Sequence, residues 1–329
     1  MKFENIIIVI FLSFFSLIFL NFVSRKLLLF DYPSKHKNHK MPTPYTGGIA
    51  LISLFFFLIK FLNTHELFEI VLTYSILIIL IGFFDDFMNL NPGPKLFFLC
   101  LPIILLVYRY ELIVIDIGEY KYFGNLVFIK FSIIFTILSI LLLINAFNYF
   151  DGSDGQLSSQ AIISLCYLIF LSKNEINNYL FFIIIFLLIF LFFNVSKNKK
   201  FKMFLGDCGS LTLGFIIAFT IIIIYKESKI HPAFFMWSVA IFVFDFLHVT
   251  LSRFVKKINP FLKTKNHLHD IKILISRDIK SRIAIVTLIN LFFITYGYII
   301  TNYISVDLSL ISFILFFLIY FKIKQINLS

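Results

Sequence analysis

The stretch FSIIFTILSILLLINAFNYFDGSDG, residues 131–155, joins a long apolar run to a compact polar cluster. Phe131–Ile144 is almost entirely apolar, and a second apolar run, Ala161–Leu171, follows the cluster. In a helix, positions 145, 148, 151 and 155 share one face. The glycines predict a break or a left-handed turn near residues 152–155. A polar loop between two membrane spans is the simpler alternative, but such loops rarely concentrate two amides, two carboxylates and two glycines in this way.

The composition identifies a membrane protein. The chain has 329 residues, of which 60% are hydrophobic and 14% charged, and its mean hydropathy is +0.96. Soluble domains contain about 45–50% apolar and about 25% charged residues. The odd number of widely spaced cysteines predicts neither a disulfide framework nor a cysteine metal site. The net charge of +11 agrees with basic loops beside a membrane, so it does not require a nucleic acid.

Eleven apolar stretches predict an all-α polytopic membrane protein with about ten or eleven spans in a single domain, residues 1–329. The first stretch, Asn5–Val23, has no small-residue cleavage site after it, which favours a retained span over a signal peptide. The second, fourth and eighth are short for a span of about 20 residues. Residues 111–128 predict a small turn or hairpin outside the membrane. The remaining stretches are at 47–62, 68–84, 96–110, 129–147, 157–172, 178–195, 209–225, 232–250, 281–302 and 308–322.

The basic residues predict an orientation. The connections after odd-numbered spans, with the C-terminal tail, hold 21 of the 29 Lys and Arg residues. Because cytoplasmic loops are enriched in these residues, we expect the odd-numbered exits and the C-terminus in the cytoplasm and the N-terminus in the periplasm. The other side holds eight: Lys2, Lys60, Arg109, Lys121, Lys130, Lys173, Lys226 and Lys229.

Five polar clusters all follow odd-numbered spans, so they should meet at the cytoplasmic face. A transport pathway would rather leave ionisable groups along the spans themselves. The clusters cover residues 31–48, 85–95, 145–155, 194–210 and 253–270.

Acidic residues in these clusters suit a divalent ion and phosphate chemistry. Adjacent Asp85 and Asp86 close the third span, where they could bind Mg²⁺, take a proton from a nucleophile or form a solvated helix end. Lys95 suits either a phosphate contact or a membrane anchor. Asp207 and Ser210 precede the eighth span, near a helix N-terminus that attracts anions, although Asp207 could also serve as a helix cap.

Basic residues supply the complementary charge. Lys40 lies closest to the Pro-Gly turn that leads into the second span, which makes it a phosphate candidate. His267 and His269 lie in a basic loop that begins at Arg253; two histidines alone make a weak metal site and suit a pyrophosphate better. A loop lying on anionic lipid is the alternative. Within the ninth span, Asp245 is either functional or hydrogen-bonded to His248.

Together the clusters resemble the polyprenyl-phosphate N-acetylhexosamine-1-phosphate transferases (glycosyltransferase family 4). The resemblance covers residues 31–270, and the motifs occur in family order. They are HxxPxPxxGG at His39–Gly48, DDxxxLxPxxK at Asp85–Lys95, NAxNxxDGxDG at Asn145–Gly155, FLGDxGSLxLG at Phe204–Gly214 and PFxxxxxHLH at Pro260–His269.

The resemblance implies transfer of a sugar 1-phosphate from a UDP-sugar to undecaprenyl phosphate, with release of UMP and with Mg²⁺ or Mn²⁺ as cofactor. It implies that Asp207 binds the metal with Asn148 nearby, and that Asp85, flanked by Asp86, orients or activates the lipid phosphate. The remaining implied substrate contacts are Lys40, Lys95, Asp151, Asp154, Asn194, His267 and His269.

Two departures from the family pattern affect the sugar and loop assignments. Asp270 replaces a further histidine, and a Lys-rich insertion separates Asn194 from Asp207. The HLH tract resembles the N-acetylglucosamine branch more than the branch that uses N-acetylmuramoyl-pentapeptide. We therefore expect a UDP-N-acetylhexosamine donor and a role in cell-surface polysaccharide synthesis, in the bacterial inner membrane.

Three alternatives stay open at this point. They are a phospho-N-acetylmuramoyl-pentapeptide transferase of peptidoglycan synthesis, a transporter of lipid phosphates without chemistry, and a membrane scaffold. The gathering of carboxylates at one face argues against the last two. The sequence leaves open whether the chain forms a homodimer.

Overall fold

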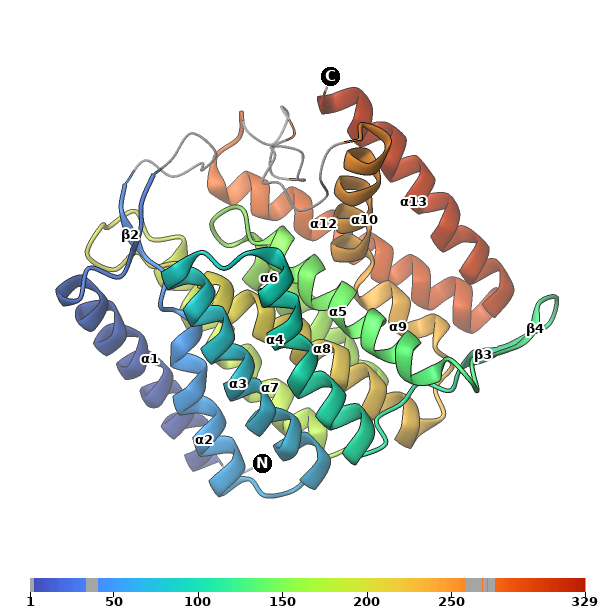
Figure 1. Ribbon diagram of the computed structural model, residues 1–329, viewed down its shortest axis with the longest axis horizontal. Helices are drawn as coiled ribbons and strands as arrows, with labels where there is room; N and C mark the ends of the chain where they lie inside the picture. The colour runs from blue at the N-terminus through green and yellow to red at the C-terminus, as the bar shows by residue number, and fades with distance from the viewer. Residues whose placement is uncertain (1–2, 34–40, 258–267, 269–270, 272–275, 329) are drawn as a thin grey trace.

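The computed structural model describes residues 3–33, 41–257, 268, 271 and 276–328, and these residues are mainly helical (Figure 1). The strands form two short antiparallel pairs, β1 (Phe30–Asp31) with β2 (Thr43–Pro44) and β3 (Asp116–Tyr120) with β4 (Gly124–Val127). The helices are α1 (Phe3–Lys26), α2 (Leu51–Phe61), α3 (Glu66–Met88), α4 (Pro92–Arg109), α5 (Ser132–Phe150), α6 (Gln156–Leu171), α7 (Ile176–Asn194), α8 (Gly206–Ser228), α9 (Ala233–Ser238), α10 (Ala240–Val255), α12 (Ile279–Ile299) and α13 (Val306–Leu328).

The prediction of an all-α polytopic membrane protein is confirmed. Within the described residues, eight helices are long and apolar enough to cross a membrane. The fourth and eighth spans are longer than predicted, at 18 and 23 residues. The second is short, as predicted, and the ninth is divided at Val239 into α9 and α10. Helix α6, with 16 residues, is also short: at about 1.5 Å per residue it spans less than the roughly 30 Å hydrocarbon core of a bilayer.

The predicted hairpin in residues 111–128 is present as β3 and β4. Its turn is held by Asp307, at the start of α13, whose carboxylate accepts hydrogen bonds from the backbone N–H groups of Lys121 (3.1 Å) and Tyr122 (2.9 Å). The hairpin lies away from the end of the bundle where the C-terminus is found (Figure 1).

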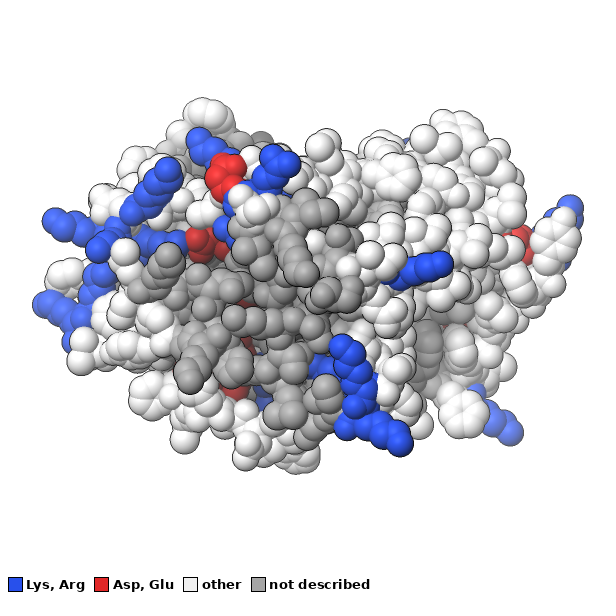
Figure 2. Space-filling model, turned by 90° about the horizontal axis from the view of Figure 1, so that it is seen from above, with Lys and Arg blue, Asp and Glu red and all other residues white. Residues whose placement is uncertain are grey.

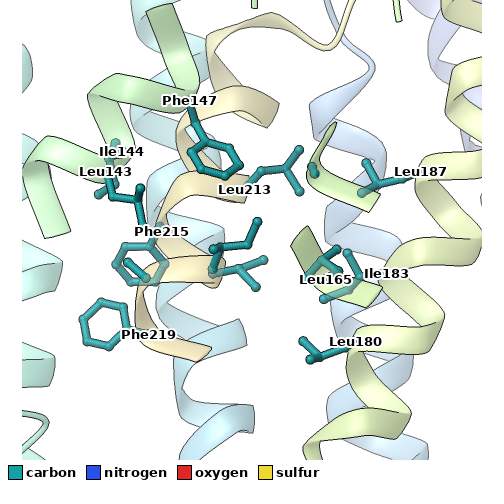
Figure 3. Close-up of a cluster of buried hydrophobic side chains, with 14 of the residues drawn as sticks. Leu143, Ile144, Phe147, Leu165, Leu180, Ile183, Leu187, Leu213, Phe215 and Phe219 are labelled. Atoms are coloured by element: carbon teal, nitrogen blue, oxygen red, sulfur yellow. The ribbon is translucent and has the colours of Figure 1, made fainter. Parts of the chain in front are cut away.

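Helix α8 is the centre of the bundle, and 89% of its apolar 18-residue segment is buried. Its side chains Leu213, Phe215 and Phe219 lie between α5 on one side and α6 and α7 on the other (Figure 3). Since lipid tails are as apolar as these side chains, association of the helices depends on close packing rather than on removal of apolar surface from water.

Two glycines allow α8 to approach its neighbours. A Cβ atom at Gly82 of α3 would lie 2.4 Å from Cys208 Cα, and one at Gly214 of α8 would lie 2.7 Å from Ile144 Cα of α5. Any larger residue would separate these backbones. The contact at Gly82 also fixes the depth of Asp85, one helical turn further along α3, against the start of α8.

Asp245 is bound within the bundle by α13. Its Oδ1 atom accepts a hydrogen bond from Tyr320 (3.0 Å) and forms an ion pair with Lys324. Both charged groups are almost completely buried. This interaction holds α13, which is otherwise largely exposed to the lipid side, against α10.

We predict that Gly82→Ala destabilises the protein by about 1–3 kcal/mol, since the added methyl group would overlap the backbone of α8. Thermal unfolding in detergent should show a clearly lower midpoint. The matched control is Gly93→Ala in α4, where no atom lies within 4 Å of the added methyl group. Equal midpoints for the two variants would contradict the close contact of α3 with α8.

Candidate active site

The turn between α3 and α4 places Lys95 beside Asp85. Asn89 ends α3 in the left-handed conformation (φ 52°), and the backbone N–H of Leu90 donates to Asp85 Oδ1 (2.9 Å). Pro92 then starts α4, as suits a residue without a backbone N–H. Lys95 therefore lies in the first turn of α4, beside the last turn of α3.

The end of α5 meets the start of α8. Gly206 takes a left-handed conformation (φ 74°) immediately before Asp207, which lies in the first turn of α8 as predicted. Asn148, in the last turn of α5, donates through Nδ2 to Asp207 Oδ1 (2.9 Å) and to Ser210 Oγ (2.9 Å). These bonds orient the amide so that its oxygen is left for another partner.

Lys95 is the common partner of these elements. Its ammonium lies 2.6 Å from Asp85 Oδ2, 2.8 Å from Asp207 Oδ2 and 3.4 Å from Asn148 Oδ1. Four helices thus contribute to one polar centre, which is mostly shielded from solvent. Two carboxylates in such a place repel each other unless a cation lies between them, and here the ammonium does so.

Asp86 lies beside this centre and caps α8. Its Oδ2 atom accepts a hydrogen bond from the backbone N–H of Cys208 (3.3 Å) in the first turn of that helix. A carboxylate at a helix N-terminus satisfies orphan N–H groups and complements the helix dipole. The adjacent acids of α3 thus have different partners: Asp85 binds Lys95, and Asp86 holds the start of α8.

The turn after α5 forms a second group of contacts. Gly155 has φ 73°, which confirms the predicted left-handed turn. Asn194 Oδ1 accepts from the backbone N–H of Gly155 (2.5 Å), and its Nδ2 donates to the carbonyl of Met203 (2.9 Å). Asp154 forms an ion pair with Lys202 at 2.5 Å. Asn194 therefore joins the turn to the segment before α8, and its role toward a nucleotide stays a prediction.

The prediction of one helical face for positions 145, 148, 151 and 155 is wrong beyond Asn148. Helix α5 ends at Phe150, so Asp151 and Gly155 belong to the turn. Asn145 donates to the carbonyl of Leu141 in its own helix (2.7 Å), whereas Asn148 reaches α8.

Asp151 has an altered acidity. Burial, together with the nearby carboxylates of Asp207 and Asp154, raises the pKa of Asp151 from 3.8 to about 7. The folded protein therefore retains a proton on Asp151 between about pH 4 and pH 7 that the unfolded chain releases. The contribution of Asp151 to the free energy of unfolding is therefore fully present below about pH 4 and is lost as the pH rises toward 7.

We predict that Asp151→Asn raises the unfolding midpoint relative to the wild type at pH 8 but has much less effect at pH 5, because asparagine cannot ionise. Thermal unfolding in detergent without substrates or metal would measure this. The control Glu119→Gln, an exposed residue of the hairpin, should match the wild type at both pH values. A difference between Asp151→Asn and wild type that is the same at pH 5 and pH 8 would contradict the raised pKa.

The donors at the centre fit a hard divalent ion. Asp85, Asp207 and Asn148 direct three oxygens at one cationic atom, and oxygen ligands are those that Mg²⁺ and Mn²⁺ prefer. Among the residues the structure describes, no group of three or more His, Cys, Asp and Glu side chains is arranged to enclose a metal. An ion here would therefore need ligands from substrate phosphates and water, as is usual for Mg²⁺.

Three predicted contacts, Lys40, His267 and His269, lie outside the described residues. Leu268, between the two histidines, is described and is buried in the core. Arg253, at the end of α10, is buried and lies 5.5 Å from the ring centre of Tyr149, next to Asn148. Seen from above, this end of the bundle carries Lys and Arg side chains around the described part of its rim (Figure 2).

The sequence predicted the four residues of the polar centre but missed a partner in the turn after α5. Asp85, Lys95, Asn148 and Asp207 are brought together, as expected for residues of one site. Lys202, which pairs with Asp154, was not predicted. Its signal was the Lys-rich insertion itself, which places four lysines between Asn194 and Asp207.

Comparison with known proteins defines the class. The family model of glycosyl transferase family 4 matches residues 68–225, which contain Asp85, Lys95, Asn148 and Asp207. The segment that carries the polar centre is thus similar to glycosyl transferase family 4. The chain is a multi-pass bacterial membrane protein of the phosphotransferase class.

Three relatives carry the same name, undecaprenyl-phosphate alpha-N-acetylglucosaminyl 1-phosphate transferase. The Yersinia pestis protein is 27% identical over 275 residues, which are 79% of this chain and 74% of that protein. The Escherichia coli K12 protein is 25% identical over 269 residues, 78% of this chain and 72% of that protein. The Pasteurella multocida protein is 28% identical over 282 residues, 78% of this chain and 74% of that protein.

Proposed function

We propose that this protein transfers N-acetylglucosamine 1-phosphate from a UDP-sugar to undecaprenyl phosphate and releases UMP. The names of the relatives support the substrates. The observation that carries the proposal is the contact of Lys95 with Asp85, Asp207 and Asn148, which gathers positive charge and oxygen ligands at one end of a membrane bundle.

The chemistry requires two anions to meet. The lipid phosphate and the nucleotide repel each other by Coulomb's law, and this repulsion is larger where water is scarce. An oxygen of the lipid phosphate attacks the β-phosphorus of the UDP-sugar. The bond from that phosphorus to the oxygen bridging it to the α-phosphate breaks, and UMP leaves with that oxygen.

The residues of the centre have distinct proposed roles in this step. Lys95 exchanges a carboxylate partner for a phosphate oxygen and offsets its charge. Asp85 orients the lipid phosphate. Asp86 keeps the first turn of α8 in place, so that Asp207 stays at a fixed depth. Asp151 and Asp154 shape the nucleotide side, where the ion pair with Lys202 holds the turn.

Mg²⁺ or Mn²⁺ is the proposed cofactor, with Asp207 and the amide oxygen of Asn148 as ligands. When bound, such an ion would neutralise phosphate charge and polarise the phosphorus–oxygen bonds. We further propose an inner-membrane location with this end of the bundle and the C-terminus in the cytoplasm and the N-terminus in the periplasm. The distribution of Lys and Arg along the chain supports this orientation.

We predict that Asp207→Asn lowers UMP release by at least about 100-fold, because it removes the negative charge that would bind the proposed divalent ion and that pairs with Lys95. Detergent-solubilised protein with undecaprenyl phosphate and UDP-N-acetylglucosamine would give the rate, and mass spectrometry would identify the lipid product. Glu119→Gln, at the hairpin, is the control and should retain activity. A folded Asp207→Asn variant with normal turnover would refute the assigned role.

We also predict that chelation of divalent ions abolishes UMP release and that Mg²⁺ or Mn²⁺ restores it. The oxygen ligands at the centre favour both ions over softer metals. The same assay with EDTA, followed by each metal in turn, measures this. Full activity after complete metal removal would exclude the proposed cofactor. A panel of UDP-sugars in the restored reaction would test the donor, and a preference for UDP-N-acetylmuramoyl-pentapeptide would replace the proposed substrate.

A further inference from the structure

A cavity of about 420 Å³ lies at the end of α8 opposite to Asp207. It is bounded by the last residues of α8, by the segment that follows them and by the base of the β3–β4 hairpin. The volume is within the range of small-molecule sites, roughly 300–1,000 Å³. Its lining includes Ile113, Ile115, Asp116, Lys226, Lys229 and His231.

The hairpin wall of this cavity is fixed by His231. Its Nδ1 atom accepts from the backbone N–H of Ala233 (3.1 Å), so Nε2 carries the hydrogen and donates to the carbonyl of Glu119 (3.1 Å). Gly118 has φ 100°, and a Cβ there would lie 2.3 Å from His231 Nε2. Only glycine allows the hairpin to lie this close to His231, so the cavity is built into the fold.

The charged residues of the lining are two lysines, Lys226 and Lys229, and one carboxylate, Asp116. Lys226 donates to the backbone carbonyl of Glu111, a neutral partner. Within the described residues, neither Lys226 nor Lys229 forms an ion pair with a carboxylate. Asp116, the acidic residue of the lining, accepts instead from Tyr225 and from the backbone N–H of Gly118 (3.0 Å). Burial lowers the pKa of His231, so its imidazole stays neutral near pH 7.

The position of the two lysines is unusual in two respects. They are two of only eight Lys and Arg residues on the side of the chain where basic residues are sparse. Lys229 also ends α8 in the left-handed conformation (φ 54°), a position that favours glycine or asparagine. A lysine at a helix C-terminus complements the helix dipole, so the cavity is a second reason for a positive charge at this position.

We propose that this cavity binds the phosphate-bearing headgroup of an anionic membrane lipid. The two ammonium groups would bind the phosphate, and the apolar lining of Ile113, Ile115 and Ile230 would contact the adjoining glycerol and acyl carbons. Ile115 is 54% exposed, as expected for a rim facing lipid. The site lies at the end of the bundle away from the proposed active site and does not depend on the proposed reaction.

The test measures lipid retention by native mass spectrometry of the purified full-length chain. Wild-type protein should retain phosphatidylglycerol more strongly than phosphatidylcholine. Lys226→Gln with Lys229→Gln should weaken retention of phosphatidylglycerol by about 25-fold, since each lysine near a membrane surface contributes about a factor of five. The control, Lys130→Gln with Lys173→Gln, removes the same charge on the same side outside the cavity and should bind as the wild type does.

A second variant tests the cavity without a change in charge. Ile115→Trp should fill the space and also weaken retention of phosphatidylglycerol. Thermal unfolding of each variant establishes that it is folded. The proposal is overturned if the cavity variants retain phosphatidylglycerol as strongly as the control does. It is also overturned if the wild-type protein retains phosphatidylcholine as strongly as phosphatidylglycerol. Binding of glycerol phosphate as tight as that of phosphatidylglycerol overturns the lipid as source and assigns the cavity to a soluble phosphate.

Discussion

The contact of one ammonium group, that of Lys95, with two carboxylates is the interaction on which the rest of the site depends. Asp85 and Asp207 come from helices that are far apart in sequence, and like charges at this distance in a poorly hydrated bundle end would force them apart or neutralise one of them. A single cation between them makes the arrangement stable. It also places a positive group where an incoming phosphate can compete for it.

This interaction depends on the close approach of α3 to α8. Gly82 provides it, because the backbone of Cys208 occupies the space that a side chain would need. Asp86 then caps the first turn of α8, and Asn148 joins α5 to the same turn. The apolar interior and the polar centre are therefore coupled: packing of small residues within the bundle determines the geometry of charged groups at its end.

The two ends of the bundle have different chemistry. At one end, Lys and Arg side chains gather on the surface (Figure 2), and the ion pair of Asp245 with Lys324 holds α13 beside α10. At the other end, basic residues are fewer, and the base of the hairpin borders a cavity that two lysines line. Helix α8 connects them, since Asp207 lies in its first turn and Lys226 in its last. The protein therefore has, at the end of the bundle opposite to Asp207, a cavity that the proposed reaction does not use.

The sequence by itself determined the class of fold, the approximate spans, the hairpin and the gathering of Asp85, Lys95, Asn148 and Asp207. These follow from local properties: apolar runs must become helices in a bilayer, and the alternation of spans places every second connection on the same side. Only the tertiary structure decided which partner each side chain has. The separate roles of Asp85 and Asp86, the use of Asn194 to hold Gly155, and the pairing of Asp154 with Lys202 depend on helix depth and rotation. These are set by contacts between residues distant in sequence, such as Gly82 with Cys208, and no local pattern records them.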